Sequence, residues 1–237
     1  MSLKKIVVII ILEVITSSTT NAHNFEYGLE LGLGVSVIHM SDVPSEIPYT
    51  SMYNPIPIYN INAFVSYRGK SFWGLSVEPG IIQKGGIQLF DSRMSNSQII
   101  HNNVFVVERY IQVPVLYNIY LGKRFYFSVG PEMAYRLSEG ANSTNTVNNT
   151  DMSVTAYKSL GNNVVADNIL PDEERRFEIS GVLGINYCVN EKFDIGLRYS
   201  YGFNNLVDVT WVDKLGYFLG HSSTHNQYLQ FLMKLKI

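Results

Sequence analysis

The end of the chain alternates strictly between apolar and polar positions. Leu229, Phe231, Met233, Leu235 and Ile237 form one face, and polar residues such as Gln230 and Lys234 stand between them. A period of two predicts a β-strand that is apolar on one side. Seven earlier stretches share the pattern, and most reach the roughly 9–11 residues that a tilted strand needs to cross a bilayer. The eight predicted strands are Tyr27–Ile38, Pro57–Tyr67, Phe72–Lys84, Phe105–Leu121, Arg124–Leu137, Arg175–Val189, Lys192–Phe203 and Asn226–Ile237.

The connections between these strands alternate between short and long. The short ones are Arg68–Ser71, Gly122–Lys123 and Asn190–Glu191, and the long ones are His39–Ile56, Gly85–Val104, Ser138–Glu174 and Asn204–His225. Outer-membrane barrels combine short periplasmic turns with long extracellular loops. The predicted fold is therefore all-β, an eight-stranded antiparallel up-and-down transmembrane β-barrel that forms one domain. With an even number of strands, both chain ends are expected on the periplasmic side.

The two faces of each strand differ in size and polarity. In the first strand, Leu29, Leu31 and Leu33 alternate with Gly28, Glu30 and Gly32. A soluble barrel would put the bulky apolar set inside, but an eight-stranded barrel is only just wide enough to be filled by side chains. The apolar set is therefore predicted to face lipid, and the small and polar set to face the lumen.

Aromatic residues stand near the ends of the predicted strands. They prefer the headgroup region of a bilayer, so two aromatic girdles are expected. The girdle residues are Tyr59, Tyr67, Trp73, Tyr135, Tyr187, Phe193, Tyr201 and Phe203.

Charged residues also occur on the face predicted to line the lumen. They are Glu30, Glu78, Glu132, Arg136, Glu178, Arg198 and Lys234. Buried charges need partners, because an unpaired one is costly to desolvate. Counting from the turns predicts the pairs Arg136–Glu178 and Lys234–Glu30, with Glu78 and Arg198 meeting across the lumen. This network is interpreted as a structural plug of ion pairs, and a gated path for protons or ions is the alternative.

Three prolines, Pro79, Pro114 and Pro131, fall inside predicted strands. Proline removes a donor from the ladder, and a closed barrel has no edge strand to hold it. A bulge or local irregularity is therefore expected near each of the three.

The first 22 residues have the features of a secretory signal. Lys4 and Lys5 precede an apolar run, and Ala22 ends a stretch of small residues suited to cleavage. Cleavage there would leave residues 23–237 with a formal charge of −3, because two lysines and one glutamate are removed. The mature chain has no polybasic run, so no nucleic-acid partner is expected. Cys188 is the only cysteine, which excludes an internal disulfide.

The strongest catalytic candidates lie in the last predicted loop. His221 stands beside Ser222 and Ser223, and His225 follows. A nucleophile needs an activating base nearby, and two histidines could instead bind a metal. Because solvated loop residues account for the same pattern, no enzyme activity, no metal and no cofactor are expected.

Five short segments are informative as a set because of their order and spacing: residues 77–80, 83–86, 110–116, 129–132 and 193–202. Together they resemble the PorT-like outer-membrane barrel family of Bacteroidetes-type bacteria. The resemblance implies an eight-stranded outer-membrane barrel without catalytic residues. The founding members look like accessory parts of type IX secretion and gliding machinery, while most relatives have no assigned role. The expected function is structural or interactive, with a narrow porin-like channel as the alternative. The expected partners are outer-membrane lipid, the barrel-assembly machinery and other envelope or secretion proteins.

Overall fold

The computed structural model describes residues 25–42, 52–69, 72–93, 99–147, 150–152, 164–167, 176–204, 208–213 and 218–237. These residues form one antiparallel sheet, and none of them belongs to a helix long and apolar enough to cross a membrane. The wall strands are β1 (Phe25–Ser41), β3 (Ile56–Arg68), β4 (Trp73–Val77), β5 (Gly80–Arg93), β6 (Ile99–Leu121), β7 (Phe125–Val147), β10 (Phe177–Asn190), β11 (Phe193–Gly202) and β13 (Phe218–Lys236). The predicted signal peptide lies outside the described residues.

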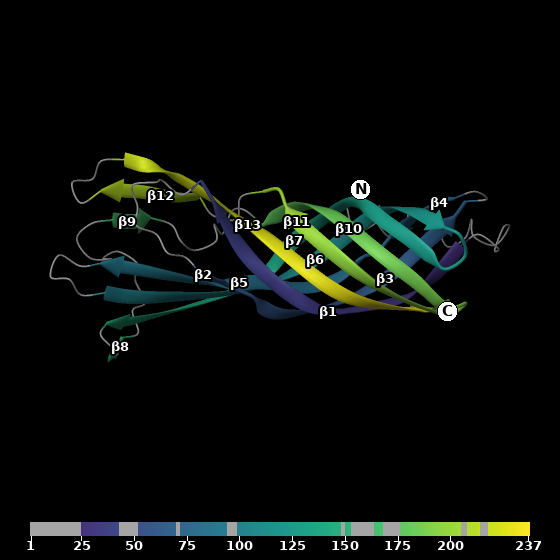
Figure 1. Ribbon diagram of the computed structural model, residues 1–237, viewed down its shortest axis with the longest axis horizontal. Helices are drawn as coiled ribbons and strands as arrows, with labels where there is room; N and C mark the ends of the chain where they lie inside the picture. Colours follow the sequence, from purple (N-terminus) through teal and green to yellow (C-terminus); the bar gives the residue numbers. More distant parts are fainter. Residues whose placement is uncertain are drawn as a thin grey trace, which may run out of the picture.

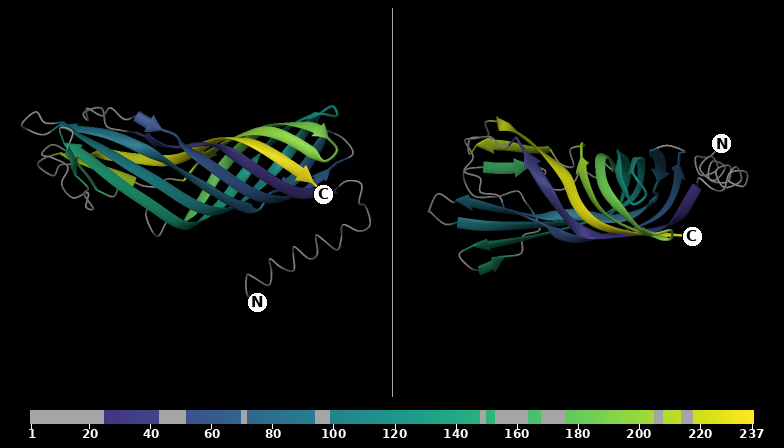
Figure 2. Two further views of the ribbon diagram at one scale, coloured as in Figure 1. Left: turned by 90° about the horizontal axis from the view of Figure 1, so that it is seen from below. Right: turned by 45° about the vertical axis from the view of Figure 1, so that its right-hand side comes forward.

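The sheet closes on itself. β1 pairs with β3 on one side and with β13 on the other, so the first and last strands complete the ring. Figure 2 shows the ring from two further directions, with the tight turns and the carboxyl end together at one end of the barrel. β4 and β5 form a single wall strand with a break in it, which gives eight passes. The predicted up-and-down barrel is confirmed.

The break between β4 and β5 falls at Glu78 and Pro79. There the Glu78 N–H donates to the Pro114 carbonyl at 3.0 Å, and the Ala63 N–H donates to the Pro79 carbonyl at 2.9 Å. Near Pro114 and Pro131 the β6–β7 ladder skips two residue pairs without changing register. The expected irregularities are thus present, as a strand break and a ladder gap rather than as bulges.

The strands continue far beyond the barrel at the end opposite the tight turns (Figure 1). β6 and β7 have 23 residues each, about twice what a membrane crossing needs. The short strands β2 (Met52–Asn54), β8 (Thr150–Met152) and β12 (Asp208–Asp213) pair with these continuations, and β9 (Val164–Asp167) pairs with β12. Much of what the sequence suggested to be long loops is therefore strand, because backbone pairing does not require the apolar alternation that a bilayer imposes.

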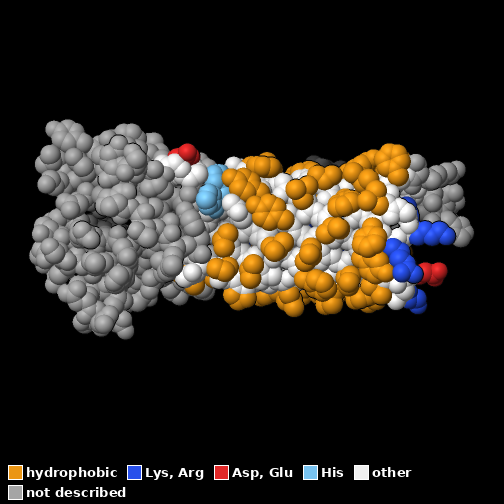
Figure 3. Space-filling model, in the orientation of Figure 1, with side chains coloured by type: hydrophobic (Ala, Val, Ile, Leu, Met, Phe, Trp, Pro, Cys, Tyr) orange, Lys and Arg blue, Asp and Glu red, His pale blue; other side chains and the backbone are white. Residues whose placement is uncertain are grey.

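Apolar side chains cover the outside of the barrel wall. Figure 3 shows them as a broad band, with lysine and arginine side chains at the tight-turn end. The predicted lipid-facing residues of β1 follow this pattern, with Leu29, Leu31 and Leu33 each about half exposed or more. The predicted orientation of the two faces is confirmed.

The lumen is less uniformly small and polar than the sequence suggested. It also holds a buried apolar layer formed by Ile56, Ile58, Ile82, Tyr110, Ala134 and Tyr228. Within this layer, Ile58 is paired with Gly34 across the β1–β3 ladder, and Ile82 is paired with Tyr110 across the β5–β6 ladder.

Candidate functional site

Four charged side chains meet inside the lumen and define the four-charge cluster: Glu30 of β1, Glu78 at the β4–β5 break, Arg198 of β11 and Lys234 of β13. Arg198 binds Glu30 through the two terminal nitrogens of its guanidinium group. The Nη1–Oε1 and Nη2–Oε2 distances are both 3.0 Å. Its Nη2 also contacts Glu78. A planar guanidinium is suited to such a bidentate grip on a carboxylate.

Lys234 completes the balance of charge in this cluster. Its Nζ contacts Glu78 and lies 3.2 Å from Glu30 Oε2. Lys234 is the most exposed of the four residues at 5%. Two cations thus compensate two carboxylates in a buried place, where an uncompensated charge would be strongly destabilising.

Neighbouring polar residues hold the two carboxylates in position. The Asn62 amide donates to Glu30 at 2.8 Å, and the Ser76 hydroxyl donates to Glu78 at 3.1 Å. Gln112 in turn donates to Asn62 at 3.2 Å. The cluster is therefore tied to the barrel wall as well as within itself.

A second group of charges, the Lys84 cluster, consists of Lys84, Glu132 and Glu178. Lys84 Nζ lies 2.9 Å from Glu132 and 2.8 Å from Glu178. Its ammonium group also stands over the rings of Tyr110 and Tyr228, at 5.0 and 5.4 Å from their centroids. The Tyr228 hydroxyl donates to Glu132. One cation here serves two carboxylates, so hydrogen bonds carry part of the compensation.

The lumen charges predicted from sequence are all buried, but their partners differ in part from those expected. Lys234 lies beside Glu30 and Arg198 contacts Glu78, as the counting from the turns suggested. The predicted pair Arg136–Glu178 is wrong. Arg136 Nη1 binds Glu108 at 2.9 Å.

The ladder register explains this difference. Glu178 lies opposite Ala134, whereas Arg136 stands two residues farther along β7, where its N–H donates to the Arg176 carbonyl at 2.7 Å. Arg136 therefore pairs with Glu108 of β6, and Glu178 pairs with Lys84.

Three buried charges, Lys84, Glu108 and Asp194, are absent from the set chosen on the sequence. Asp194 pairs with Lys236 at 3.1 Å near the tight turns, while Lys84 and Glu108 are fully buried in the lumen. Every second residue of a strand faces the lumen, and this rule identifies both Lys84 and Glu108. Lys84 continues the inward series of Gly80 and Ile82, and Glu108 precedes the inward residues Tyr110 and Gln112. Their position at the ends of predicted strands concealed this signal.

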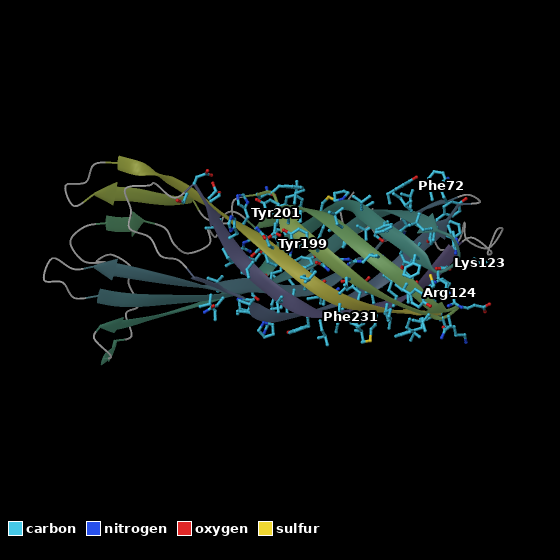
Figure 4. All side chains as sticks on the ribbon, in the orientation of Figure 1. Phe72, Lys123, Arg124, Tyr199, Tyr201 and Phe231 are labelled. Atoms are coloured by element: carbon cyan, nitrogen blue, oxygen red, sulfur yellow. The ribbon has the colours of Figure 1, made fainter. Side chains whose placement is uncertain are left out.

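The predicted girdle residues lie on the outside of the wall, and none of the eight is buried. Around the tight turns, Tyr67 packs on Trp73 with 5.7 Å between ring centroids, and Phe125 packs on Tyr187 at 4.9 Å. Toward the other rim, Tyr201 packs on Phe203 at 5.9 Å. Figure 4 shows Phe72 near the tight turns and Tyr201 toward the opposite end of the wall. The aromatic rings thus flank the apolar band on both sides.

The catalytic candidates of the last predicted loop lie in β13 instead. Ser222 is buried and its hydroxyl donates to the Asp42 carbonyl at 3.3 Å. His221 and His225 are four residues apart on one strand, about 13 Å along the backbone. The side chain of His221 lies outside the described part. Among the described residues, no three His, Cys, Asp or Glu side chains are grouped so that they could hold a metal ion.

Comparisons with known proteins agree with this architecture. A family model for the outer membrane protein beta-barrel domain matches residues 16–208. Among solved structures, neisserial surface protein A is 8% identical with a TM-score of 0.40, and the match covers 89% of this chain and 97% of that one.

Two further solved barrels are similar to the chain. OprG from Pseudomonas aeruginosa is 10% identical with a TM-score of 0.42, and the match covers 91% of this chain and 97% of that one. Ail from Yersinia pestis is 10% identical with a TM-score of 0.37, covering 88% and 99%. No curated protein matches the chain. The family match spans most of the sequence, so the chain belongs to the outer membrane protein beta-barrel domain family and is a protein of the bacterial outer membrane.

Proposed function

We propose that this protein is a non-enzymatic anchor in the outer membrane, whose filled barrel presents the extended strands to a partner at the cell surface. The observation that carries this proposal is the four-charge cluster. Side chains from β1, the β4–β5 break, β11 and β13 are joined across the lumen by direct ion pairs. Ion flow would require these buried pairs to separate, which is strongly unfavourable.

The strand continuations supply the presenting surface. β5, β6 and β7 extend on one side beyond the barrel, and β12 and β13 on the other (Figure 1). Paired strands hold a surface in place better than a free loop does. Binding residues often lie on surface segments that a rigid scaffold positions. The tight turns and both chain ends are placed in the periplasm by this proposal.

Single-channel recording tests the filled lumen. The purified protein in a planar bilayer is expected to show no steady conductance. Replacing the bridge with small residues, Glu78→Ala with Arg198→Ala, should open a measurable current and so prove that the assay can detect one. A steady wild-type current that disappears when Glu78→Leu and Arg198→Leu are combined would overturn the plug.

Affinity purification from native membranes tests the interaction role. Stable co-purification of one or more envelope proteins supports the proposal, and the resemblance to PorT-like barrels points to a secretion or envelope complex as the source. Absence of any partner, together with steady conductance, contradicts it. Unchanged lipid A in a deletion strain, measured by mass spectrometry, is the outcome expected of a protein that is not a lipid-modifying enzyme.

A narrow channel is the second candidate, favoured by one observation. Gln230 is fully buried, and neither atom of its amide has a hydrogen-bond partner among the described residues. Gln112 Oε1 and Asn226 Oδ1 share this property. Buried polar groups of this kind are usually satisfied by internal water. A file of water through the lumen would favour conduction over anchoring, and the recording above distinguishes the two.

A further inference from the structure

Two histidines stand directly opposite each other at the junction where the barrel closes. His39 of β1 is paired with His225 of β13, between the pairs Ile38–Asn226 and Met40–Thr224. Residues opposite each other in an antiparallel pair have Cβ atoms about 4.5–5.5 Å apart. Two imidazoles at that spacing can reach one ion, given nitrogen–metal distances of about 2.0–2.1 Å.

Both imidazoles point to the outside of the wall. His39 and His225 are half-buried, whereas their neighbours Ile38, Thr224 and Asn226 are buried toward the lumen. Figure 3 shows histidine side chains at the edge of the apolar band on the side away from the tight turns. The pair is therefore close to water and above the region that contacts lipid.

The ring of His225 is held in place by its surroundings. It stacks on Tyr201, with 5.7 Å between centroids and 23° between ring planes. Its Nδ1 atom is buried and has no hydrogen-bond partner among the described residues. An ion bound between the two rings would give this nitrogen a partner, and a ring already fixed by packing loses little freedom on binding.

We propose that His39 and His225 together bind a divalent transition-metal ion at the extracellular rim. Imidazole nitrogens favour copper, nickel and zinc, whereas calcium and magnesium prefer oxygen ligands. Two protein ligands leave the remaining positions of the ion to water. The ion joins β1 to β13, so its binding also stabilises the closing junction of the barrel. The site is independent of the anchoring role proposed above.

Copper titration of the full-length protein without a polyhistidine tag tests the site. Copper binds nitrogen ligands most tightly among the divalent ions of its row. All samples carry His23→Ala, because His23 stands next to the predicted cleavage point and could bind copper through a free amino terminus. Paramagnetic resonance should then report coordination by two nitrogens, and excess calcium should not displace the copper.

Variants of single histidines give the decisive comparison. His39→Asn and His225→Asn should each weaken copper binding by about tenfold or more, since losing a metal ligand costs at least as much affinity as losing the hydrogen bond that orients one. His221→Asn, on the same strand, is the matched control and should bind as the parent does. Unchanged binding in both His39→Asn and His225→Asn, with heat-dependent gel mobility showing that they fold, would overturn the proposal. An equal loss in His221→Asn would do so too.

Discussion

Arg198 binds both carboxylates of the four-charge cluster. It binds Glu30 through two hydrogen bonds and contacts Glu78 as well. Without it, two carboxylates would share Lys234 alone. At this scale the stability of the barrel depends on pairing each buried charge, since the lumen offers no bulk water to take the place of a partner.

Replacing Arg198 with methionine should destabilise the protein by about 3–5 kcal/mol, because it leaves a buried carboxylate uncompensated. Urea unfolding in lipid vesicles measures the change. Lys192→Met, in an exposed turn, is the control and should shift the free energy of unfolding by no more than about 0.5 kcal/mol. Combining Glu30→Leu with Arg198→Leu should recover part of the loss, and a double variant less stable than Arg198→Met would contradict the pairing.

Gly130 of β7 permits a close approach of backbones. A Cβ at Gly130 would lie 2.1 Å from the Val115 carbonyl oxygen, beside the ladder gap at Pro114 and Pro131. Gly130→Ala should therefore cost about 1–3 kcal/mol through overpacking. Gly184→Ala is the comparison, since its nearest neighbour would stand at 3.4 Å, an ordinary contact. Thermal unfolding of the two variants measures the difference, and equal melting temperatures would count against the close approach.

The start of β13 shows which part of a strand could be predicted from the sequence. The membrane-crossing part of β13 was predicted from Asn226 onward, but the strand begins at Phe218. Apolar and polar residues alternate only where one face of the strand contacts lipid. The alternation therefore ends where the lipid contact ends, although hydrogen bonding between the strands continues. Residues 222–224 are serines and a threonine and carry no such contrast.

The partners of the lumen charges could be predicted only in part. Alternate residues of a strand face inward, and this rule correctly places Glu30, Arg198 and Lys234 in the lumen. Which charge meets which depends on the stagger between neighbouring strands, a property of the closed ring that no local pattern records. Arg136 illustrates this, since an offset of two residues moved it from Glu178 to Glu108.

Shortening the β5–β6 continuation should separate folding from binding. Residues 89–103 can be replaced with Asn-Gly, which joins Gln88 to Val104, two residues that are paired in the sheet. The barrel is expected to fold, because everything removed lies beyond the lumen clusters. Co-purification of surface partners should be lost. A shortened protein that keeps its partners would place the binding surface elsewhere.

The whole molecule has one end of tight turns and one end of extended strands (Figures 1 and 2). Cysteine labelling of intact cells tests which end faces outward. In a Cys188→Ser background, a membrane-impermeant maleimide should label Ser143→Cys in the β7 continuation and leave Lys123→Cys in a tight turn unlabelled. Both should react after the cells are permeabilised. Labelling of Lys123→Cys alone would reverse the proposed orientation.

The four-charge cluster also bears on the order in which the molecule is made. Glu30 lies on the first strand and Lys234 on the last, so this acid is synthesised some two hundred residues before its basic partner. A barrel that enters the bilayer before its last strand has docked carries the acid without that base. The open intermediate is thereby penalised at the moment of insertion, and completing the ring removes the penalty. In the finished barrel the acid made early and the base made last lie 3.2 Å apart, so closing the ring also completes the charge balance of the cluster.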